Sequence, residues 1–109
     1  MKVVNLTPHV INIADLVGNI VRSIEPAGQA ARVTTSNVKG TPIDGIPFVE
    51  TFFGQVENLP EPQKDTIYVV SQIVIAAVPE RRDLVRPDTG PSCVRDAEGK
   101  IIAVRALTR

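Results

Sequence analysis

The sequence has little from which to build a covalent or metal-linked scaffold. Its 109 residues include one cysteine, Cys93, and one histidine, His9. Neither an intramolecular disulfide nor a zinc site of cysteine and histidine ligands can therefore form. There is no tryptophan and only 4% of the residues are aromatic, which predicts an aliphatic core. Because the core of so small a domain gives only a small free energy of unfolding, we expect a homo-oligomer.

The sequence also lacks an excess of either charge and any long apolar run. Twelve lysines and arginines balance twelve aspartates and glutamates, which argues against a nucleic-acid partner, because displacing counterions from phosphates needs a basic face. The longest apolar stretch, Ile73 to Val78, is far below the roughly 20 residues of a membrane span, and no signal peptide follows Met1. We expect one domain over residues 1–109, in the cytoplasm and without a membrane partner.

Nine prolines and seven glycines divide the chain into short segments, most of which alternate apolar and polar residues as strands do. Gly18-Asn19 and Asp44-Gly45 each lie between two such segments and predict hairpin turns. Pro42 and Pro47 lack amide donors, which predicts a sheet edge or a bulge for the second hairpin. A third hairpin is expected around the four-residue turn Asp96 to Gly99.

The segment Ser71 to Val78 fits two interpretations. Its β-branched residues favour a strand, whereas its two alanines and Ser71 at a capping position favour a helix that ends before Pro79. A strand continued from Asp65 would be unusually long, so we expect a strand and then a short helix. The predicted fold is α+β and mostly β: a small, strongly bent antiparallel sheet or open barrel of about seven short strands with one short helix.

The densest polar cluster lies between Pro79 and Pro91. Arginine pairs bidentately with phosphate, aspartate accepts hydrogen bonds from ribose hydroxyls, and Thr89-Gly90 lets backbone amides approach a ligand. Residues 80–109 hold seven basic and five acidic side chains, so this part is net positive. The alternative is a solvated loop whose arginines pair with neighbouring acids. The candidate ligand-binding residues in the cluster are Arg81, Arg82, Asp83, Arg86, Asp88 and Thr89.

The second candidate is Thr7-Pro8-His9, where the proline fixes the backbone and can aim the imidazole into a pocket. The alternative is a partly buried histidine that makes structural hydrogen bonds. Arg32 is expected to point outward, and Cys93 to be a small buried apolar residue. No phosphate-binding glycine motif, metal-ligand pair or nucleophile elbow is present, so we predict no catalytic residue, no metal and no cofactor.

Four stretches resemble a family of small proteins of phages, prophages and actinobacterial genomes. They are Val4–His9 with its NLTPH motif, Gly54–Pro62, Thr66–Ser71, and Arg82–Pro91. The resemblance spans most of the chain and carries no catalytic assignment. It implies a small accessory protein of phage origin. Phages encode compact, non-catalytic oligomers that sequester nucleotide immune signals of the host. The link from this chain to those oligomers is an analogy between classes of protein.

These observations favour a non-enzymatic protein that binds a small phosphorylated, nucleotide-derived ligand and sequesters a host immune signal. Two alternatives stay open. One is a phage structural or interaction protein without a small ligand, which packs the hairpin at Asp44-Gly45 and Phe48, Phe52 and Phe53 against another chain. The other is a hydrolase of the same signals, with His9 as general acid or base.

Overall fold

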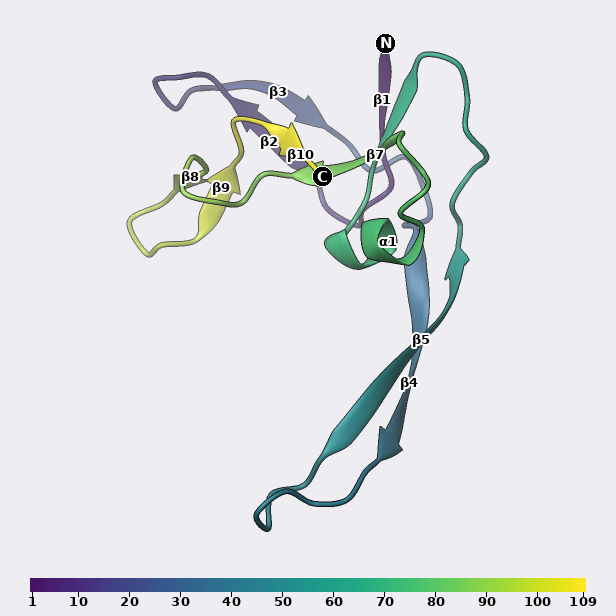
Figure 1. Ribbon diagram of the computed structural model, residues 1–109. Helices are drawn as coiled ribbons and strands as arrows, with labels where there is room; N and C mark the ends of the chain where they lie inside the picture. The colour runs from purple at the N-terminus through teal and green to yellow at the C-terminus, as the bar shows by residue number, and fades with distance from the viewer.

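The computed structural model describes residues 1–109 as ten short strands and one helix (Figure 1). The fold is mostly β with one short helix and no closed barrel, which confirms the predicted class. Strands outnumber the expected seven because two-residue pairings such as β8 and β10 carry no periodicity that a sequence pattern can show. In chain order the elements are β1 (Lys2–Asn5), β2 (Ile11–Ala14), β3 (Ile20–Ile24), β4 (Arg32–Lys39), β5 (Val49–Glu57), β6 (Thr66–Val69), α1 (Gln72–Ala77), β7 (Leu84–Pro87), β8 (Val94–Arg95), β9 (Ile101–Ala103) and β10 (Leu107–Thr108).

The largest sheet has four strands in the order β1-β6-β7-β10. β1, β6 and β7 are parallel neighbours, and only β10 runs antiparallel, against β7. The expectation of an antiparallel sheet is therefore wrong for this part of the molecule. Parallel neighbours cannot be joined by a tight turn and need a crossover connection, and the segment between β6 and β7 supplies one in α1.

The helix forms where the sequence predicted it. It begins at Gln72 and ends at Ala77, before Pro79. Ser71 occupies the N-cap position with an extended backbone, although its side chain makes no capping hydrogen bond. Val74 is the one buried residue of the helix, so α1 covers the sheet through a narrow contact. No helix of the chain has the length and apolar character that crossing a membrane requires.

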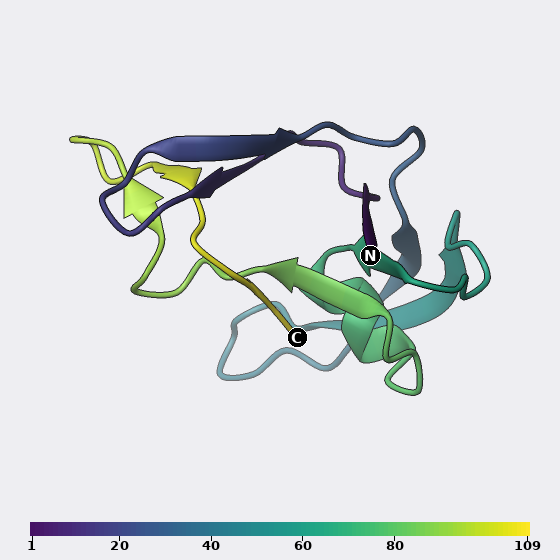
Figure 2. The same cartoon turned by 90° about the horizontal axis from the view of Figure 1, so that it is seen from above.

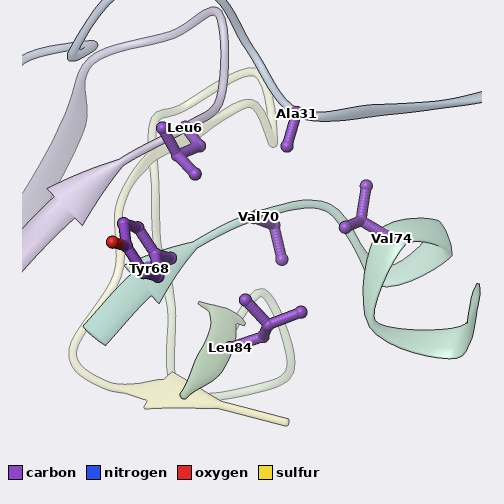
Figure 3. Packing of buried hydrophobic residues seen from close by; sticks show 6 residues of the cluster. All are labelled: Leu6, Ala31, Tyr68, Val70, Val74 and Leu84. Carbon is purple, nitrogen blue, oxygen red and sulfur yellow. The ribbon is translucent and has the colours of Figure 1, made fainter. Parts of the chain in front are cut away.

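The core consists of two small aliphatic clusters, one on each face of β6. The first core cluster brings together side chains from the loop after β1, the segment before β4, β6, α1 and β7 (Figure 3). It contains Leu6, Ala31, Tyr68, Val70, Val74 and Leu84. The second core cluster contains Ile11, Val69, Cys93 and Val104. Cys93 is thus a buried apolar residue, as expected.

In two of the three predicted hairpins, an aspartate side chain accepts hydrogen bonds from backbone amides of the turn. Between β2 and β3, Asp15 Oδ1 accepts hydrogen bonds from the amides of Val17 and Asn19, at 3.0 and 2.9 Å. Between β8 and β9, Asp96 Oδ1 accepts from Glu98 and Lys100, both at 2.9 Å. Asp and Asn side chains favour turns because they hydrogen-bond the backbone a few residues on. Figure 2 shows the two hairpins side by side, away from α1, and β2 contacts β9.

The third hairpin forms an arm, defined here as residues 32–57, which projects from the rest of the molecule (Figure 1). At its tip, Ile43 and Ile46 exchange two backbone hydrogen bonds around Asp44 and Gly45. Both of these residues have positive φ, 51° and 76°, as the tightest hairpin turns require. At its base Arg32 points outward and pairs with Glu57 at 3.1 Å, which confirms the exposure expected for Arg32.

Candidate functional site

A cavity of about 640 Å³ lies beside the parallel strands, within the size range of small-molecule sites. It is lined by the loop after β1, the first residues after β6 and the end of β7, with β9 opposite. These are the carboxyl ends of all three parallel strands, and open parallel sheets bind ligands outside that edge. Four of the eight predicted ligand-binding residues line this cavity: Thr7, His9, Arg86 and Thr89.

The loop that carries Thr7 and His9 is held by Asn5, a residue that the sequence reasoning missed. Asn5 is 1% exposed at the end of β1. Its amide nitrogen donates to the carbonyl oxygens of His9 and Ile24, at 2.7 and 3.0 Å. Its oxygen accepts from the Thr7 amide at 2.9 Å and from the Thr7 hydroxyl at 2.6 Å. A lone asparagine that ends a β-branched run before Thr-Pro is the signal that could have found it.

The His9 imidazole is exposed and makes no hydrogen bond within the chain. Its backbone is engaged instead, because the carbonyl accepts from Asn5 and the amide donates to the Thr7 hydroxyl at 3.4 Å. The structure therefore does not use this ring as a structural hydrogen-bonding group. Both ring nitrogens remain available to a molecule in the cavity.

Arg86 supplies the charge of the cavity. It is half-buried in β7, and its Nε is the one buried side-chain nitrogen or oxygen without a hydrogen-bond partner in the chain. Neither of the two ion pairs of the molecule involves Arg86. A desolvated cationic donor that lacks an acceptor raises the free energy of the folded chain. The Arg86 side chain lines the cavity, so an anion bound there would pair with its guanidinium group.

The lining holds no acidic side chain, and Arg86 is its only arginine or lysine. Its remaining surface is largely apolar. Val10, Ile101 and Ile102 are exposed hydrophobic side chains that line it. The cavity can therefore bind an anionic group at Arg86 and an apolar group against Val10, Ile101 and Ile102.

Arg81 and Asp83 pair with each other and do not line the cavity. Arg81 Nε and Nη2 donate to the two carboxylate oxygens of Asp83, each at 2.9 Å, and Nη2 also donates to the carbonyl oxygen of Pro60 at 2.9 Å. The hydrogen bonds from Arg81 hold the pKa of Asp83 below its ordinary value, against the opposing effect of burial. The same pair raises the pKa of Arg81. For Arg81, the structure therefore matches the alternative interpretation of the cluster, in which an arginine pairs with a neighbouring acid.

The two other predicted residues also lie outside the cavity lining. Arg82 is exposed, and its carbonyl oxygen accepts a hydrogen bond from Arg109. Asp88 is half-buried and accepts from the amide of Gly90 at 3.0 Å, which shapes the turn after β7. Of the three arginines that the sequence offered as ligand-binding candidates, only Arg86 lines the cavity.

Comparison with known proteins adds no relative. The sequence matches no protein-family model and no curated protein, and the structure matches no solved structure. No three His, Cys, Asp or Glu side chains lie close enough together to hold a metal ion. The geometry and chemistry of the cavity are therefore what indicate a function for this protein.

Proposed function

We propose that this protein binds a small phosphorylated ligand in the cavity and sequesters it without converting it. The observation that carries the proposal is the half-buried Arg86 guanidinium, with an Nε that has no partner in the chain, in a lining free of carboxylates. Guanidinium matches phosphate oxygens in a planar, two-point geometry. The exposed His9 ring and the Thr89 side chain lie on the same lining and can add further donors.

The apolar part of the lining supports a nucleotide-derived ligand over inorganic phosphate. A base or similar flat group can cover Val10, Ile101 and Ile102, which the chain itself leaves exposed. Sequestration requires only affinity, and a micromolar complex corresponds to roughly −8 kcal/mol. The resemblance to small phage proteins adds the proposal that the ligand is an immune signal of the infected host and that the protein acts in the host cytoplasm.

The hydrolase alternative has weaker support. General acid–base catalysis by a histidine usually needs a second group that orients the ring or activates a nucleophile. The lining contains no Asp, Glu or Cys, so His9 has no such partner there. The alternative of an interaction protein without a small ligand is favoured by the exposed arm, which shares no residue with the cavity.

Calorimetric titration of the purified chain with ADP-ribose, cyclic dinucleotides and inorganic phosphate tests the proposal. We expect micromolar or tighter binding of one nucleotide class, and recovery of that nucleotide intact by chromatography after heating. Arg86→Ala should weaken binding by about tenfold or more, because hydrogen bonds to charged groups contribute about 1.5–3 kcal/mol. Arg82→Ala, an exposed arginine outside the lining, is the matched control and should bind as the unaltered chain does.

Three outcomes would contradict sequestration. One is the absence of binding across the panel, and another is equal affinity of the Arg86→Ala and Arg82→Ala variants. The third is a cleaved product, which would establish the hydrolase alternative. Capture of a defined protein partner by the Arg86→Ala variant, without any nucleotide binding, would favour the interaction protein.

A further inference from the structure

The arm exposes more apolar surface than a hairpin in water requires. Of the sixteen large hydrophobic side chains that the molecule leaves exposed, seven lie between residues 38 and 53, including all three phenylalanines. Phe52 and Phe53 are 50% and 59% exposed. Large exposed apolar side chains that gather on one element mark an interaction site in a folded protein.

The apolar residues occupy both faces of the arm. Phe52 pairs with Ser36 and Phe53 with Thr35, and successive residues of a strand point to opposite faces. An isolated two-stranded hairpin is at best marginally stable in water, and stability requires further strands or packing against another element. Only the base of the arm, where Val33 and Val56 pack against the first core cluster, has such support within the chain.

The exposed area is large enough for a stable interface. The chain exposes 7518 Å², whereas a compact monomer of 11.8 kDa exposes about 5,900 Å². The excess of roughly 1,600 Å² is about twice the ~800 Å² that one partner buries in a standard interface. The radius of gyration, 16.8 Å, likewise exceeds the ~13 Å expected for a compact chain of this length.

The charge pattern of the arm fits a second copy of the same chain. Residues 33–38 of β4 and 51–56 of β5 contain no charged side chain. In a two-fold interface residue i contacts residue j and j contacts i, and a residue close to the axis lies near its own copy, so a charge at the axis would face a like charge. Lysines, prolines and inward charges are what natural proteins use to prevent strands from pairing with other chains. Here Lys39 is the last residue of β4, at the end nearer the tip, and Pro42 and Pro47 lie outside both strands.

We propose that the arm packs against the arm of a second copy in a two-fold dimer, through the face that carries Phe53. The uncharged portions of β4 and β5 form the interface, and the cavity remains outside it. The dimer is independent of the ligand proposal, because Arg86 lies on β7 and not in the arm.

Sedimentation equilibrium tests the dimer. The unaltered chain should sediment at twice 11.8 kDa, and Phe53→Lys should sediment as a monomer because it places two like charges near the axis. Val21→Lys is the matched control: Val21 is an exposed apolar residue of β3, at 63% exposure, and lies outside the arm. It should remain dimeric. Circular dichroism verifies that both variants fold.

A second measurement requires no variant. In hydrogen exchange, the backbone amides of β4 and β5 should become more protected as the chain concentration rises through the dissociation constant. A monomeric chain at all concentrations would overturn the proposal, as would dissociation by Val21→Lys but not by Phe53→Lys. Stoichiometric capture of a different polypeptide by the arm of a monomeric chain would identify another occupant and would also overturn it.

Discussion

Arg81 and Arg86 are five positions apart, and the structure uses them in opposite ways. Arg81 has a full set of partners in Asp83 and the Pro60 carbonyl, so its charge is satisfied within the chain. Arg86 has none, and its Nε is buried without an acceptor. The first side chain therefore stabilises the loop before β7, while the second is available to a ligand. A sequence pattern cannot distinguish them, because the difference lies in which carboxylate and carbonyl oxygens the fold brings near each guanidinium.

The Arg81–Asp83 pair should make stability sensitive to acid. Its side chains are 16% and 17% exposed, so Asp83→Asn should lower the free energy of unfolding by about 1–3 kcal/mol at neutral pH. Because the folded-state pKa of Asp83 is lowered, its contribution is complete above the unfolded value of about 3.9 and is lost as pH falls through the folded value. Urea unfolding from pH 7 to pH 2 measures this.

The expected result is a difference between the unaltered chain and Asp83→Asn that is constant above about pH 5 and shrinks below about pH 4. Asp44→Asn, at the exposed tip of the arm, is the control and should show little difference at any pH. A difference that persisted undiminished at pH 2 would show that Asp83 stabilises the fold by something other than its charge.

At the scale of the elements, the loop between β1 and β2 depends on a single side chain. Asn5 joins this loop to itself and to β3 through the carbonyl of Ile24. Removing the Asn5 side chain takes a partner from the Thr7 amide and from the carbonyl oxygens of His9 and Ile24. Because Asn5 bonds directly to Thr7 and to the His9 carbonyl, its loss should let these two residues of the cavity lining shift.

Asn5→Ala should therefore destabilise the chain and weaken ligand binding together. We expect a loss of about 2–3 kcal/mol in the free energy of unfolding, from several net hydrogen bonds of about 1 kcal/mol each. Affinity for the bound nucleotide should also fall, as titration would measure. Asn19→Ala, at an exposed asparagine of the turn between β2 and β3, is the control and should change stability by no more than about 0.5 kcal/mol. Unchanged affinity in Asn5→Ala would show that the loop does not position the ligand.

The elements that the sequence predicted well are those with local causes. The Gly18-Asn19 and Asp44-Gly45 turns and the helix before Pro79 are set by residues close in the chain. The parallel pairing of Lys2 with Thr66 depends on residues far apart in the sequence, and no local pattern encodes it. That pairing also brings the loop of His9 to the same sheet edge as Arg86. Half of the eight candidate residues line the cavity, but the sequence alone could not show that these four lie together.

At the scale of the whole molecule, the core is small for the length of the chain. Only 14 of 109 residues are buried, and ten of them form the two core clusters on opposite faces of β6. Burial of apolar surface is the main favourable term in folding, and here a large share of that surface lies on the arm and remains exposed in one copy. The stability of the fold should therefore be coupled to assembly.

Such coupling predicts a melting temperature that depends on chain concentration. A partner that binds the folded chain and not the unfolded one stabilises it in proportion to the logarithm of its concentration. A hundredfold rise in chain concentration above the dissociation constant should raise the melting temperature by several degrees, as calorimetry would show, and Phe53→Lys should abolish the rise. Val21→Lys should retain it. Equal melting temperatures of the unaltered chain at all concentrations would mean that the two small clusters suffice, and that the exposed phenylalanines contribute nothing to folding.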